Sequence, residues 1–129
     1  MIIDIKYYSQ YLDVHDPYWQ PRSCSIVCLK MIMDFYRPGD KKNEVPVIGE
    51  LIKEGFLIGG FGMDGWIHDA IVILAHNYGF SAYRQEFRSM DIDYESKKMQ
   101  EGIYHGKVLQ DGVDKIVRYL HSKRPVVVS

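Results

Sequence analysis

The chain has 129 residues, of which 47% are hydrophobic and 26% are charged, a balance typical of one globular domain. Its net charge of -1 argues against nucleic acid as a partner, because nucleic-acid-binding modules usually carry a clear basic excess. No run of about 18 apolar residues occurs, so the sequence predicts no membrane span. The alternating start "MIIDIKYYSQ" differs from a secretion signal and favours the cytoplasm.

The first elements are predicted to be a strand, an ordered loop and a long helix. Residues 2–8 alternate between apolar and polar side chains, as a short strand does. Residues 9–23 are rich in Asp, Pro and Ser and indicate a loop. The run "CSIVCLKMIMDFY", residues 24–36, predicts a helix with Ser23 as its N-cap and a stop at Pro38.

The helix over residues 24–36 is apolar on nearly every side. Its polar stripe consists of Lys30 and Asp34, one turn apart. A helix with so little polar surface is typical of the middle of a domain.

Two further helices are expected in the centre of the chain. The first covers residues 47–54 and is closed by Gly55. The second covers residues 66–78, with Asp64 as its cap and Gly79 as a left-handed stop.

The C-terminal third is predicted to hold two strands and an amphipathic helix. Residues 80–87 and residues 125–129 have strand-like composition, and residues 112–122 have one apolar helical face. Residues 89–107 are polar and indicate partly helical structure. Helices combined with short strands predict the α+β class.

Cys24 is the candidate reactive group. A helix N-terminus favours an anion through its unpaired backbone N–H groups, so a thiolate is favoured at Cys24, whereas Cys28 lies one turn too deep. The backbone N–H of Cys24 and a side-chain amide from Gln10 or Gln20 would be suitable donors to an oxyanion. The alternative is a buried helix that contains two small hydrophobic residues.

The remaining residue types point to no cofactor and no metal. Two cysteines four residues apart on a helix cannot bridge, and the five histidines show no metal-ligand spacing. His15, in the loop near Cys24, and His68, beside Trp66 where it could face a cleft, are the internal histidines that could act as a base, although a structural role is favoured for both. His76 is expected on a solvated helix face, and His105 has no identifiable partner.

Several strings together resemble a known family. They are "YYSQ", then Trp19, "SCSIVCLKMIMDFY", "GMDGWIHDAIVILAHNYGFSA" and "KRPVVVS". This set resembles the N-terminal part of the papain-like cysteine peptidases of the bacteriocin-processing (C-39-like) group. The resemblance implies a papain-like α+β fold, mostly its helical lobe, with a central buried helix and an incomplete antiparallel sheet. It covers residues 1–129 as a single domain that lacks the C-terminal sheet segment.

The resemblance also implies roles for individual residues. Cys24 corresponds to the nucleophile, and Gln10, by its Ser-Gln context, corresponds to the oxyanion glutamine, with Gln20 as the alternative. Ser25 departs from the family, which usually has glycine directly after the nucleophile. The family's histidine base and its Asp or Asn partner follow the Pro-Val-Val strand, so we expect the chain to be incomplete or inactive as a peptidase.

The expected partner is a peptide or protein substrate. The alternative function is a non-catalytic peptide-binding or assembly module on the same fold, with a cleft lined by Trp19, Trp66 and nearby tyrosines. The strand predicted over residues 125–129 would leave an open edge, which favours self-association.

Overall fold

The computed structural model describes residues 2–38, 45–87 and 110–129. The chain divides into two compact units, one of residues 2–84 with 127–129 and one of residues 85–126. The described part combines helices with a small antiparallel sheet, which confirms the α+β class. In chain order the elements are η1 (Gln20–Arg22, a 3-10 helix), α1 (Cys24–Tyr36), α2 (Ile48–Leu57), β1 (Phe61–Gly62), β2 (Gly65–Trp66), α3 (His68–Asn77) and α4 (Gln110–His121).

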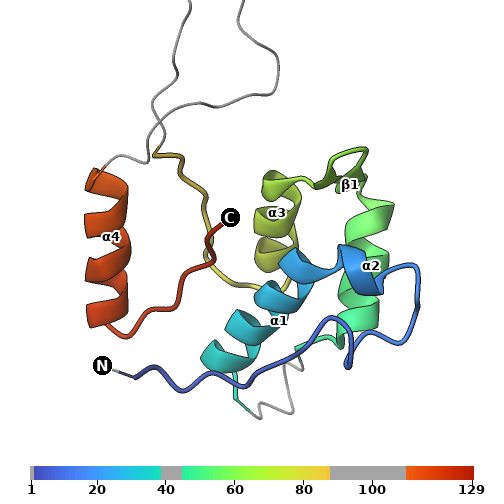
Figure 1. Cartoon of the computed structure of the whole chain (residues 1–129), viewed down its shortest axis with the longest axis horizontal. Coiled ribbons are helices and arrows are strands. Elements are labelled where there is room, and N and C mark those ends of the chain that lie inside the picture. Colours follow the sequence, from blue (N-terminus) through green and yellow to red (C-terminus); the bar gives the residue numbers. More distant parts are fainter. Residues whose placement is uncertain (1, 39–44, 88–109) are drawn as a thin grey trace, which may run out of the picture. The chain divides into compact units, whose positions relative to one another are not determined.

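The core of the first unit lies among α1, α2 and α3, which pack against one another in pairs (Figure 1). Ile26 and Met33 of α1, Leu51 of α2 and Leu74 of α3 are completely buried. Burial of each such side chain contributes about 1.5–3 kcal/mol. The predicted bounds of the first helix, residues 24–36, are confirmed.

In the polar stripe of α1, Lys30 is buried and Asp34 is half-buried. Lys30 is only 7% exposed, and its Nζ lies 2.9 Å from Asp34 Oδ1 and 3.4 Å from the Val45 carbonyl. The Tyr8 hydroxyl donates to Asp34 Oδ2 at 2.5 Å. The stripe therefore holds the N-terminal segment and the chain before α2 against α1.

Three helices end in the same hydrogen-bond motif. Gly59, Gly79 and Lys123 follow α2, α3 and α4 with φ of 73°, 81° and 57°, and each donates its N–H to a carbonyl three residues back. The residue after each donates to a carbonyl five residues back, which completes a Schellman motif. The prediction for Gly79 is confirmed.

The predicted stop at Gly55 is wrong. Gly55 lies inside α2, which continues to Leu57 and ends before Gly59. A Cβ at Gly55 would lie 2.6 Å from Trp66 Cζ3, so this glycine serves close packing and not helix termination.

The predicted start of the next helix is also wrong. Residues 61–66 form a hairpin in which Phe61 pairs with Trp66 and Gly62 pairs with Gly65, and α3 begins at His68. Asp64 lies in the tight turn of this hairpin and does not cap α3. Gly65, with φ of 105°, permits the turn.

The three predicted strands are not strands in the described structure. Residues 2–8, 80–87 and 125–129 have no ladder partner among the described residues. Phe80 and Ala82 nevertheless pack against the core of the first unit. Residues 125–129 form no strand within the chain, and self-association through this segment stays a prediction.

The second unit contains α4, close to the predicted range of 112–122. Gly112 packs tightly on Phe87, since a Cβ there would lie 2.5 Å from Phe87 Cβ, and Lys115 donates to the Gln85 side chain. The prediction for residues 89–107 lies outside the described residues.

Candidate functional site

Cys24 is the first residue of α1, and its side chain is exposed. Cys28, one turn later, is half-buried, and burial together with the nearby Cys24 raises the pKa of its thiol. The Cys24 Sγ lies 4.0 Å from Ser25 Oγ. Of the two thiols, Cys24 is therefore the one open to an electrophile.

The N-terminus of α1 is left without a side-chain cap. Ser23 occupies the N-cap position as predicted, but its hydroxyl donates to the Trp19 carbonyl at 2.5 Å and not to the helix. The Ser23 carbonyl accepts the first helical bond, from the Val27 N–H at 2.9 Å. Within the described residues, the backbone N–H groups of residues 24–26 have no acceptor. Unpaired N–H groups of this kind at a helix N-terminus favour a nearby anion.

An aromatic cluster holds the chain just before Cys24. The Trp66 indole Nε1 donates to the Arg22 carbonyl at 2.7 Å. The Trp19 ring packs against Trp66, Phe61 and Phe56, with centroid distances of 5.7, 5.0 and 5.9 Å. The hairpin and α2 thereby fix the short turn from which α1 begins.

The two candidate glutamines lie in different settings. Gln20 is half-buried in η1, and its Nε2 donates to the Val14 carbonyl at 2.9 Å. Gln10 is half-buried at the turn after Ser9, and its amide makes no hydrogen bond to another described residue. Neither amide is hydrogen-bonded to Cys24, so an oxyanion role for either remains a prediction.

No histidine in residues 2–38, 45–87 or 110–129 forms a hydrogen bond with Cys24. His76 bonds through Nε2 to a main-chain carbonyl six residues later, at 2.8 Å. His68 is exposed at the start of α3, and His15 is exposed in the loop before η1. His105 lies outside the described residues.

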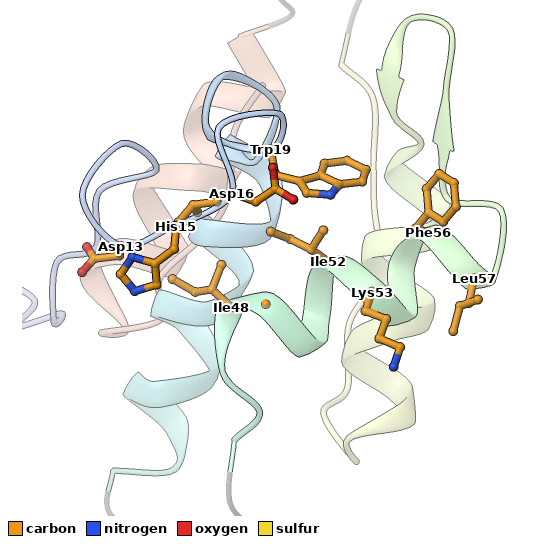
Figure 2. A pocket seen from close by; sticks show the side chains of 11 residues that line it. Asp13, His15, Asp16, Trp19, Ile48, Ile52, Lys53, Phe56 and Leu57 are labelled. Atoms are coloured by element: carbon orange, nitrogen blue, oxygen red, sulfur yellow. The ribbon is translucent and has the colours of Figure 1, made fainter.

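A groove that the sequence did not predict lies between the 13–19 loop and α2 (Figure 2). Its volume is about 480 Å³, and its floor contains Val14, Ile48 and Ile52. Trp19 lines the groove, whereas Trp66, which was expected to share a cleft with it, does not. The groove depends on how the loop packs on α2, and no local pattern in the sequence signals that contact.

Neither a metal cluster nor a membrane-crossing helix occurs in the described part of the chain. No three His, Cys, Asp or Glu side chains gather there, and none of its helices combines the length and apolarity needed to cross a bilayer. No protein-family model matches the chain, and no curated protein or solved structure matches it.

Proposed function

We propose that the chain is a cysteine peptidase-like domain with a papain-like α+β fold, in which Cys24 is the nucleophile. The observation that supports this proposal most strongly is the exposed thiol at the first residue of a buried helix whose first-turn N–H groups are uncapped. Catalytic cysteines act as thiolates, and this setting favours a negative charge.

The reaction would proceed through an acyl-enzyme. The Cys24 thiolate attacks the carbonyl carbon of a peptide bond, and the carbonyl oxygen becomes an oxyanion. When the tetrahedral intermediate collapses, the C–N bond breaks, the amine leaves with a proton, and a thioester remains for water to hydrolyse. The Cys24 N–H is the first oxyanion donor in this scheme, and an amide from Gln10 or Gln20 is the second. Gln20 retains one amide hydrogen beyond its bond to Val14.

The proton transfers need a base that the described residues do not bring to Cys24. Members of a nucleophile–base unit act together, so loss of the base removes most of the rate. We therefore propose that these residues alone are inactive or nearly so in peptide hydrolysis. This does not prevent the thiol from reacting with a strong electrophile.

A matched pair of electrophiles tests the proposal in the Cys28→Ala variant. Acetyl-Ala-Ala-chloromethyl ketone presents a peptide next to the reactive carbon, and chloroacetone presents the same group without one. Mass spectrometry should show Cys24 labelled at least about tenfold faster by the peptide reagent, because binding raises the local concentration of the electrophile. The Cys24→Ser variant is the control for labelling elsewhere. Equal rates would refute the peptidase proposal and peptide binding beside Cys24, and would leave the assembly module.

A further inference from the structure

We infer that the groove between the 13–19 loop and α2 docks a segment of a partner polypeptide that carries an aliphatic side chain next to a lysine or arginine. This inference goes beyond the proposed function, because Cys24 does not line the groove. It holds whether or not the thiol reacts.

The apolar part of the groove is suited to an aliphatic side chain. Ile48 and Ile52 of α2 are buried and form its floor, and Gly49 between them adds no side chain (Figure 2). A Cβ at Gly49 would meet no atom within 4 Å, so the space above it is open. The volume of about 480 Å³ lies within the range of ligand-binding pockets, roughly 300–1,000 Å³.

The polar part of the groove carries two carboxylates, Asp13 and Asp16, on the loop and one ammonium group, Lys53, on α2. Figure 2 shows Lys53 away from Asp13 and toward the Leu57 end, so the loop wall itself is acidic. Asp13 Oδ2 accepts the Ser9 N–H at 2.7 Å, and Asp16 Oδ1 accepts the Tyr18 N–H at 2.8 Å. Each bond fixes a carboxylate, and the other oxygen of each has no hydrogen-bond partner within the described residues. Two fixed carboxylates beside an apolar floor complement a cation carried on an apolar stem, as in lysine and arginine.

The wall that carries these charges is held in place before any ligand binds. The Asp16 carbonyl accepts the N–H groups of Trp19 and Gln20, both at 3.0 Å. The Gln20 side chain closes the loop on the Val14 carbonyl. A wall that is already ordered loses little conformational entropy on binding, which favours affinity.

The surface around the groove favours a polypeptide over a small amine. Phe56 and Leu57 at one end are 56% and 71% exposed, so apolar surface continues past the floor along α2. Figure 2 shows these two side chains at the opposite end from Asp13 and His15. A chain segment can cover this length, whereas a small amine covers only the floor.

Fluorescence polarisation with labelled hexapeptides tests the inference on the full chain with Cys24→Ala, which separates binding from thiol chemistry. Gly-Ser-Leu-Arg-Ser-Gly should bind more tightly than versions with Leu→Ser or Arg→Glu. Gly49→Leu fills the groove and should weaken binding by about tenfold or more, the loss typical of a central contact. Asp13→Asn with Asp16→Asn keeps both loop acceptors and should weaken binding about fivefold, with less dependence on salt.

Two controls lie outside the groove. Glu50→Leu adds the same side chain at the neighbouring exposed position of α2, and Asp64→Asn removes a carboxylate from the hairpin turn; both should bind like the parent. The inference fails if no peptide binds saturably at millimolar concentration, or if Gly49→Leu or the double Asp→Asn variant binds like the parent. It also fails if n-hexylamine binds as tightly as the Leu-Arg peptide, since the site would then be one for small amines.

Discussion

Two glycines of α2 offer a matched test of how this helix packs. Gly49→Ala and Gly55→Ala make the same chemical change. Gly55→Ala gains helix propensity of up to about 1 kcal/mol, and Gly49→Ala, at the second residue of α2, gains less. A Cβ at Gly49 meets open space, whereas a Cβ at Gly55 would lie 2.6 Å from Trp66 Cζ3, 3.0 Å from Trp66 Cη2 and 3.2 Å from Leu74 Cδ1. Overpacking of this kind costs about 1–3 kcal/mol.

Because the propensity gain is larger at Gly55 than at Gly49, a lower stability of Gly55→Ala reports the cost of the contact with Trp66. Gly49→Ala should be the more stable by about 1–3 kcal/mol in free energy of unfolding. For a chain of this size that difference corresponds to roughly 4–12 °C in Tm. Urea unfolding followed by tryptophan fluorescence is the assay, because Trp19 and Trp66, the two tryptophans of the chain, both lie in the first unit.

The same pair of variants links packing to the candidate site. Displacement of Trp66 by Gly55→Ala should weaken its bond to the Arg22 carbonyl and loosen the turn before Cys24. Alkylation of Cys24 should therefore change in Gly55→Ala and not in Gly49→Ala. Equal stability of the two variants would refute the account of how α2, the hairpin and the start of α1 fit together.

Three other predictions concern charge, pH and a helix end. Asp34→Ala should lower the free energy of unfolding by about 3 kcal/mol, because it leaves the buried Lys30 ammonium without its anion. In urea unfolding, the double variant with Lys30→Met should regain part of that loss. Burial raises the pKa of Tyr78 and of Tyr8 above the usual value near 10, and so does the hydrogen bond that each makes, Tyr78 to Glu54 and Tyr8 to Asp34. The stability that their neutral forms provide is therefore complete below about pH 10 and is lost as pH rises further. Urea midpoints from pH 8 to 11 should fall above pH 10, and less steeply in Tyr78→Phe; an unchanged slope would contradict this assignment. Lys123→Gly relieves a left-handed residue at the end of α4 and should stabilise the helix by about 1 kcal/mol, measured by circular dichroism, whereas Gly79→Ala should destabilise α3 by a similar amount.

Local patterns in the sequence predicted the helices well where apolar periodicity and stop residues agree. The bounds of α1 and the left-handed Gly79 follow from such signals. Gly55 misled the prediction because a glycine that allows close packing looks the same in the sequence as one that ends a helix. The strand-like composition of residues 80–87 wrongly predicted a strand, because a strand also needs a partner, which no local pattern supplies.

The sequence likewise predicted only part of the candidate site. The exposure of Cys24 at a helix start follows from its position after the loop. The hydrogen bond from the Trp66 indole to the Arg22 carbonyl is a tertiary contact that no local pattern signals. The bonds from Ser23 to Trp19 and from Gln20 to Val14 are local, but they depend on the irregular fold of the loop before α1. The groove above Gly49 depends on the packing of the 13–19 loop on α2, two segments that are 29 residues apart at their nearest lining residues, Trp19 and Ile48.

The most direct test of the central claim is the rate of Cys24 alkylation by iodoacetamide at pH 7, measured in the Cys28→Ala variant. The reference is an unstructured peptide with the sequence of residues 20–28 and alanine at position 28. The uncapped end of α1 contributes about 0.3–1 kcal/mol to an anion, so the folded chain should react faster than the peptide, by up to about fivefold. A folded chain that reacts more slowly than the peptide would show that the thiol is shielded and would contradict a nucleophilic role for Cys24.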